Sequence, residues 1–199
     1  MSVNLKSKAE QIIAILNDLP EVKHCTVYGS LSVNTYDELS DIDINIDVSG
    51  NDNGQFMLNL VERLRDKIKI YYYDYAPSLI PDSYIVSIAI DENNPFLIAD
   101  LQCSANPHCV TVTKKQVKEL NNKFAHILKL WTANLKHYSR GADCYNDIVR
   151  MANKLQISDI DIKDGATLLE NTLCWLESNA SHEFDTFMKS CRDKFNELI

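Results

Sequence analysis

Hydrophobic and polar residues alternate without interruption between residues 41 and 48. One set of positions holds isoleucine and valine, and the other holds polar side chains, three of them acidic: Ile42, Ile44, Ile46 and Val48 against Asp41, Asp43, Asn45 and Asp47. Successive side chains of a β-strand point to opposite faces, so the pattern predicts a strand with one buried and one acidic face. A solvated sheet face beside an ordinary turn is the alternative interpretation, but it leaves the concentration of negative charge unexplained.

Two segments with apolar residues at intervals of three and four, 5–19 and 56–68, predict helices on either side of this strand. Three further segments are rich in β-branched and aromatic residues: 69–75, 83–90 and 96–103. The turn-forming residues 91–95 join the last two segments, which predicts a hairpin. The first part of the chain is therefore expected to hold a mixed sheet flanked by helices.

From residue 112 onward no clear strand pattern remains. Thr113-Lys114-Lys115-Gln116 has the form of a capping box, and apolar residues then recur at helical spacing up to Gly141, which predicts one long helix. Three more helices are predicted over 145–155, 169–176 and 184–198. The expected fold class is α+β, with one domain over residues 1–110 and a helical bundle over residues 111–199.

Composition places few further limits on the chain. Of its 199 residues 45% are hydrophobic and 24% charged, which is ordinary for a globular protein. No segment approaches the roughly twenty apolar residues of a membrane span, and the first residues lack a signal-peptide core, so no membrane association and a cytoplasmic location are expected. The six cysteines are scattered without a Cys-x-x-Cys pair, which favours buried thiols.

Candidate chemistry lies in two neighbouring segments. Residues 25–28 are short and apolar enough for a strand, Gly29 permits a sharp exit from it, and Ser30 begins a turn whose N–H groups and hydroxyl could hold a polyphosphate. Asp41 and Asp43 are two residues apart on a strand, so their Cα atoms lie about 6 to 7 Å apart and their carboxylates project to one side. Such oxygen ligands favour Mg²⁺, which indicates a site for a nucleoside triphosphate with Mg²⁺.

The ordered set of Gly29-Ser30, ten intervening residues and Asp41-Ile42-Asp43 resembles the signature of the DNA polymerase β-like nucleotidyltransferase superfamily. The resemblance implies a nucleotidyltransferase fold, one or two Mg²⁺ ions and nucleotidyl transfer with release of pyrophosphate. In that superfamily a third carboxylate comes from a later strand, and Asp100, an acid within an apolar segment, is the residue that resembles it. Asp91 is a weaker candidate. Whether Asp100 would be a metal ligand or the general base stays open.

The layout of a small motif-bearing part followed by a bundle resembles nucleotidyltransferases that modify aminoglycosides and lincosamides, and so implies antibiotic resistance. The segment 136–143 is similar to an Arg-Gly-Asp-like helix end in some of those enzymes, although Ala142 interrupts the motif here. The resemblance implies that Gly29 and Ser30, with Lys136 or Arg140, contact the nucleotide phosphates. A basic last turn that complements the helix dipole is the alternative for Lys136 and Arg140.

The formal net charge of −8 argues against binding of nucleic acid and favours a small, cationic acceptor such as an amino-sugar. The leading hypothesis is transfer of AMP from ATP to a hydroxyl of an aminoglycoside or lincosamide. One alternative is AMP transfer to a protein hydroxyl, as in toxin- or antitoxin-type members of the superfamily, and another is a catalytically silent nucleotide- or partner-binding module. An RNA-tailing polymerase fits the charge least. Assembly into a homodimer is left open.

Overall fold

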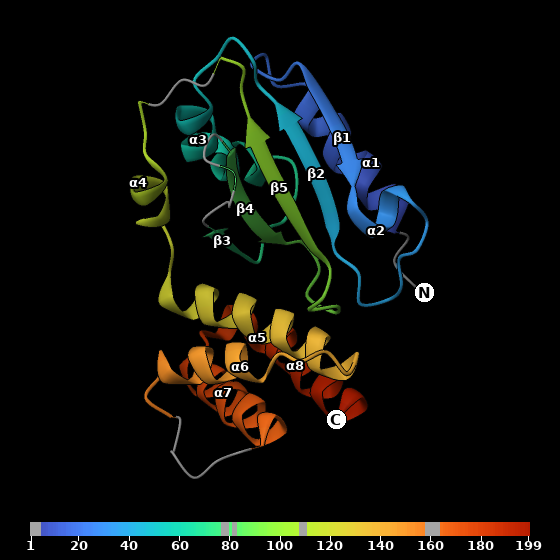
Figure 1. The fold of residues 1–199 in the computed structure, drawn as a ribbon, viewed down its shortest axis with the longest axis vertical. Coiled ribbons are helices and arrows are strands. Elements are labelled where there is room, and N and C mark those ends of the chain that lie inside the picture. Colours follow the sequence, from blue (N-terminus) through green and yellow to red (C-terminus); the bar gives the residue numbers. More distant parts are fainter. Residues whose placement is uncertain (1–4, 77–79, 81–82, 108–110, 158–163) are drawn as a thin grey trace. The chain divides into compact units, whose positions relative to one another are not determined.

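The computed structural model describes residues 5–76, 80, 83–107, 111–157 and 164–199. The chain divides into two compact units, of which the first comprises Met1–Asp91 with Leu97–Asn121 and the second Glu92–Phe96 with Asn122–Ile199. Figure 1 shows a sheet with its helices in the first unit and a group of helices in the second. The domain boundary predicted after residue 110 falls at a position outside the described residues.

The first unit is built on a mixed sheet of five strands within the described residues. These strands are β1 (His24–Tyr28), β2 (Ile42–Asp47), β3 (Tyr72–Ala76), β4 (Ser83–Ala89) and β5 (Ile98–Ser104). Their order across the sheet is β1-β2-β5-β4-β3, in which only the β2–β5 pair is parallel. The antiparallel pairing of β4 with β5 confirms the predicted hairpin.

One face of this sheet forms the core of the unit. Ile42, Ile44 and Ile46 of β2 are fully buried, whereas the polar residues between them are only half-buried, as the alternating pattern predicts. Helices α1 (Leu5–Asn17) and α3 (Asn53–Arg65) contribute their apolar residues to the same core, and both lie behind the strands in Figure 1. The opposite face of β1, β2 and β5 carries mostly polar side chains.

The single long helix predicted after Thr113 is wrong, because the chain forms two helices there. The capping box is present at the start of α4 (Lys114–Lys118), but a second helix, α5 (Lys123–Ser139), begins afresh. The Asn122 side chain accepts hydrogen bonds from two backbone N–H groups of α5 at 2.7 and 3.3 Å, so it is the N-cap of the new helix. Apolar periodicity runs through both helices and does not reveal this break.

The neighbouring residue Asn121 explains why α4 ends before it. Its side-chain oxygen accepts a hydrogen bond from the Tyr75 backbone N–H at 2.7 Å, and its amide nitrogen donates to the Tyr75 carbonyl at 2.8 Å. The side chain therefore takes the place of a neighbouring strand along the edge strand β3. Of these two consecutive asparagines, Asn121 therefore pairs with the edge of the sheet and Asn122 caps the following helix.

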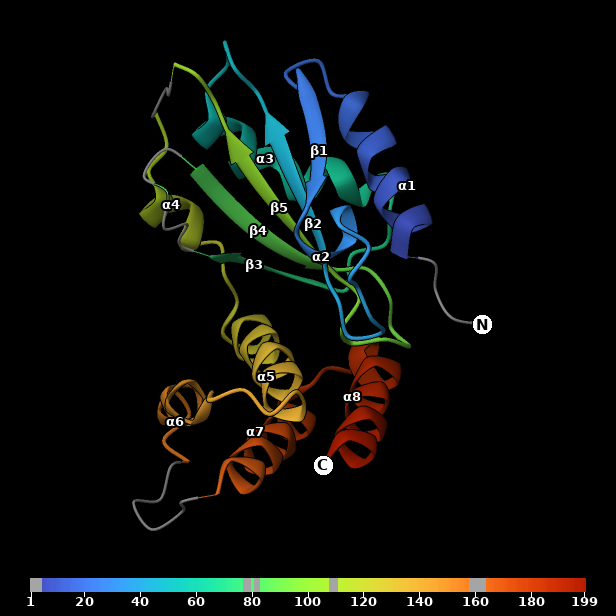
Figure 2. The same cartoon turned by 45° about the vertical axis from the view of Figure 1, so that its right-hand side comes forward.

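The second unit is a helical bundle, as predicted. It contains α5, α6 (Tyr145–Asn153), α7 (Gly165–Asn179) and α8 (Asp185–Leu198), with a short 3₁₀ turn at His182–Phe184. Figures 1 and 2 show α5 and α7 side by side. None of the helices in the described part of the chain is long and apolar enough to cross a bilayer.

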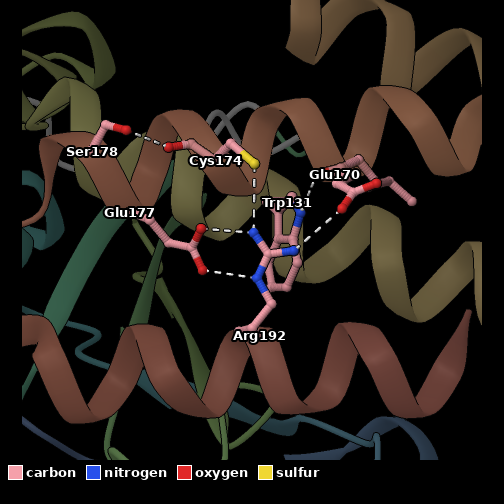
Figure 3. Close-up of polar contacts among 7 residues, drawn as sticks. Trp131, Glu170, Cys174, Glu177, Ser178 and Arg192 are labelled. Carbon is pink, nitrogen blue, oxygen red and sulfur yellow. Dashed lines mark hydrogen bonds and ion pairs between the residues drawn. The ribbon is translucent and has the colours of Figure 1, made fainter.

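Polar contacts tie three helices of the bundle together (Figure 3). The fully buried Trp131 of α5 donates from its indole nitrogen to the Leu169 carbonyl of α7 at 2.9 Å. The Arg192 guanidinium of α8 makes two hydrogen bonds to the Glu177 carboxylate of α7, at 2.9 and 2.6 Å, and a third to the Cys174 thiol at 3.5 Å. The bidentate pair holds the pKa of Arg192 above its ordinary value.

Replacing Trp131 by phenylalanine is expected to lower the free energy of unfolding by about 1 to 3 kcal/mol, because the Leu169 carbonyl loses a donor and the smaller ring leaves a gap. Urea denaturation followed by circular dichroism measures the change. Trp175→Phe is the matched control, since Trp175 is only half-buried and the expected loss is smaller. Equal losses in both variants would contradict the role given to Trp131.

Candidate active site

A row of side chains crosses the polar face of the sheet, with one residue from each strand. The register pairs Tyr28 with Asp43, Asp43 with Asp100, Asp100 with Ser87, and Ser87 with Asp74. Register-paired residues on neighbouring strands project to the same face of a sheet. Because Asp43 alternates with the buried isoleucines of β2, this row lies on the face opposite α1 and α3.

Gly29 begins the short helix α2 (Gly29–Ser32) beside this row. Its φ of +66° lies in the left-handed region that favours glycine, which agrees with the expected sharp exit from β1. A Cβ atom at this position would lie 3.1 Å from the carboxyl carbon of Asp43 and closer still to its Oδ2. Gly29 is therefore required for the space occupied by the Asp43 carboxylate as well as for its backbone conformation.

Asp41 follows a turn whose side chains bond to one another. The Asp37 carboxylate accepts hydrogen bonds from the Leu39 N–H at 3.1 Å and from the Ser40 hydroxyl at 2.8 Å. The Ser40 hydroxyl in turn accepts one from the Asp37 N–H at 3.0 Å. This turn leads directly into Asp41, which immediately precedes β2, although the sequence indicated only a polar connection here.

The negative charges on this face of the sheet affect the ionisation of the Tyr28 hydroxyl. Burial raises the pKa of Tyr28 to about 12, and the charges of Asp43, Asp100 and Asp41 contribute in that direction. All three carboxylates thus act on one phenol, which stays protonated at neutral pH. Tyr28 was not predicted as a site residue, although it directly precedes Gly29 in the motif.

The Asp100 side chain is hydrogen-bonded by a residue of β4, the strand that pairs with β5 on the side away from β2. The Ser87 hydroxyl, fully buried on β4, donates to Asp100 Oδ1 at 2.5 Å. A hydrogen bond to a carboxylate fixes the direction in which the remaining oxygen points. Ser87 was not predicted as a site residue, because only the register of the hairpin places it beside Asp100.

Among the residues predicted for the site, the structure places Gly29, Ser30, Asp41, Asp43 and Asp100 in the first unit, around the ends of β1 and β2 and on β5. Lys136, in the last turn of α5, and Arg140, at its C-cap, belong to the second unit. The weaker candidate, Asp91, follows the end of β4 and is not a member of the polar row.

The carboxylates of Asp43 and Asp100 suit a metal ion that takes most of its ligands from water and substrate rather than from the protein. In the described part of the chain, no three His, Cys, Asp or Glu side chains are arranged as a metal-binding group. Mg²⁺, however, is commonly bound by one or two carboxylates and completes its shell with water and substrate phosphates. The register-paired carboxylates of Asp43 and Asp100 fit that donor set.

Comparison with models of known protein families agrees with this geometry. The family model described as "Polymerase beta, Nucleotidyltransferase" matches residues 10–87, which include the Gly29-Ser30 and Asp41-x-Asp43 motifs. Comparison with curated protein sequences gave no match. Residues 10–87 therefore resemble a polymerase β-type nucleotidyltransferase domain, which supports the placement of this segment in the DNA polymerase β-like nucleotidyltransferase superfamily.

Two solved structures show a distant likeness in fold. One is the polymerase core of TRAMP, an RNA surveillance complex, with 12% identity over 96% of this chain and 55% of that chain, at a TM-score of 0.36. The other is from the GLD-2/RNP-8 complex, with 13% identity over 98% of this chain and 64% of that chain, at a TM-score of 0.32. This chain therefore spans less than two thirds of the length of either.

Proposed function

We propose that the protein transfers AMP from Mg²⁺-ATP to a hydroxyl group of a small molecule, such as an aminoglycoside or lincosamide, and releases pyrophosphate. The observation that carries the proposal is the polar row, in which Asp43 and Asp100 are register-paired beside Gly29, in a chain of the nucleotidyltransferase superfamily. In this proposal residues 1–110 form the catalytic domain and residues 111–199 a helical domain.

The chemistry assigned to the site is displacement at the α-phosphorus. The acceptor oxygen forms a bond to that phosphorus as the bond to the pyrophosphate oxygen breaks. One or two Mg²⁺ ions held by Asp41, Asp43 and Asp100 supply neutralisation of phosphate charge when bound. The acceptor proton passes to a carboxylate, for which Asp100 is the candidate because it is register-paired with Asp43. Asp100 acting solely as a metal ligand is the alternative.

Nucleotide contacts are assigned by the resemblance to the superfamily. Gly29 and Ser30, at the start of α2, are the proposed contacts of the β and γ phosphates, and Lys136 or Arg140 the proposed cationic contact. Catalysis then consists of holding the reactants in line and stabilising developing charge.

The acceptor class is supported by the net charge of −8 and is tested by the products. The purified protein is incubated with Mg²⁺ and ATP labelled in its α-phosphate, and with kanamycin, lincomycin, an RNA oligonucleotide or cell extract. We expect pyrophosphate release and label on a small amine-bearing acceptor. Label on RNA or on a protein would replace the small-molecule assignment, and no label with any acceptor would favour a catalytically silent module.

Ser87→Ala is expected to reduce the rate of transfer about tenfold or more while leaving Mg²⁺-ATP binding unchanged, because Asp100 loses a charge-assisted hydrogen bond. The rate and the affinity are measured separately, by pyrophosphate release and by calorimetry. Ser83→Ala is the matched control on the same strand, since the buried Ser83 hydroxyl has no hydrogen-bond partner among the described residues. A wild-type rate in Ser87→Ala would refute the positioning role.

A further inference from the structure

A pocket of about 390 Å³ lies on the same polar face, at the opposite end of β1 and β2 from Gly29. Its lining includes His24, Thr26, Asn45, Asp47, Ser49 and Ser104. This volume falls within the range of small-molecule binding sites. None of these residues belongs to the nucleotide and metal site proposed above.

Polar side chains connect the pocket to the catalytic row along three adjacent strands. On β2 the residues of this face are Asp43, Asn45 and Asp47, and the register places Thr26 beside Asn45 and His24 beside Asp47. On β5 the corresponding residues are Asp100, Gln102 and Ser104. Asp47 follows Asp43 by four residues, which corresponds to roughly 13 Å along a strand. A molecule of two or more rings could therefore extend from the row to the pocket.

The chemistry of the pocket selects against phosphate and against stacked bases. Its lining residues in the described part of the chain include no lysine, arginine, phenylalanine, tyrosine or tryptophan. They provide hydroxyl and amide groups, the imidazole of His24 and the carboxylate of Asp47. Hydrogen bonds from the Ser49 hydroxyl and N–H lower the pKa of Asp47, so this carboxylate is ionised at neutral pH. Hydroxyl groups and an ammonium group are the ligand groups that match this set.

Hydrogen bonds fix the wall of the pocket in advance. The Asp47 carboxylate accepts from the Ser49 N–H at 2.8 Å, and the Ser49 hydroxyl accepts from the Asn106 N–H at 2.8 Å. The Val48 N–H donates to the Ser104 carbonyl at 2.9 Å. The segments that follow β2 and β5 are thus joined around Asp47, which reduces the ordering required when a ligand binds.

We propose that this pocket binds the amine-bearing, hydroxyl-rich end of the acceptor, with an ammonium group on Asp47 and hydroxyl groups on Asn45, Thr26 and Ser104. The reactive hydroxyl of the same molecule then lies at Asp43 and Asp100. That the bound molecule is an acceptor rests on the proposed function. Binding in the pocket itself requires neither nucleotide nor metal.

The experiment measures binding of kanamycin, an amine-bearing polyhydroxylated probe, to the full chain by calorimetry without ATP or Mg²⁺. We expect saturable binding whose Kd rises about tenfold in Asp47→Asn, which keeps an oxygen for the Ser49 N–H but loses the charge. Asp164→Asn is the matched control, because Asp164 is a hydrogen-bonded helix N-cap in the second unit and asparagine caps equally well.

The outcomes separate this proposal from the proposed function. Binding that depends on Asp47 and persists in Asp43→Asn supports the pocket, even if no acceptor gains a nucleotide. Absence of saturable binding up to millimolar kanamycin overturns it, and so does equal weakening by Asp47→Asn and Asp164→Asn. Competition by an RNA oligonucleotide for the same Asp47-dependent site would also overturn it, because the proposal assigns the pocket to an ammonium group and its lining holds no lysine or arginine for phosphate.

Discussion

Asp43→Asn is expected to reduce nucleotidyl transfer by about a thousandfold or more without unfolding the protein. Asparagine has nearly the same shape as aspartate, so β2 and its register are preserved. The side chain nevertheless loses the negative charge that, in the proposal, binds the Mg²⁺ ion of the Mg²⁺-triphosphate complex. Pyrophosphate release measures the loss of transfer, and calorimetry measures the Mg²⁺-dependent binding of ATP. Both are expected to disappear together in this variant.

The control for Asp43→Asn is Asp147→Asn, which removes the same charge from an exposed residue of α6 paired with Arg150. This variant should retain wild-type transfer and wild-type ATP binding. Transfer at the normal rate in Asp43→Asn would remove Asp43 from the proposed mechanism. ATP binding that needs no Mg²⁺ and is equal in both variants would favour a nucleotide-binding module over an enzyme.

Gly29→Ala is expected to lower transfer about a hundredfold and also to destabilise the fold. The left-handed conformation at φ +66° disfavours alanine by about 1 kcal/mol, and the new Cβ displaces the Asp43 carboxylate, which lies 3.1 Å away at its carboxyl carbon. A displacement of about 1 Å at a reacting centre is sufficient for a rate loss of that size. Urea denaturation and pyrophosphate release measure the two effects.

Gly50→Ala separates the conformational effect from the contact with Asp43. Gly50 has φ +89° in the same unit, but a Cβ there would meet no atom within 4 Å. We expect this variant to lose a similar free energy of unfolding and to keep its rate of transfer. Comparable rate losses in the two glycine variants would show that stability, rather than the space beside Asp43, limits activity.

Several features of the fold were predictable because they depend on residues close together in the sequence. The strand at residues 42–47 follows from strict alternation, and the capping box at Thr113 from two polar side chains three residues apart. The break between α4 and α5 was missed because apolar spacing continues across it. What ends the first helix is the pairing of Asn121 with Tyr75, a residue 46 positions away.

The candidate site, too, was predictable only where it depends on residues close together in the sequence. The sequence alone determined the motif pair, Gly29-Ser30 and Asp41-x-Asp43, because both consist of local geometry and recognisable residue types. Only the tertiary structure placed Asp100 beside Asp43 and Ser87 beside Asp100, because the register of a sheet depends on how distant strands pack their buried faces. It also placed Gly29 beside the Asp43 carboxylate and extended the polar face into a pocket. Both features depend on which strands pair, and the alternation of residues within a single strand does not specify that pairing.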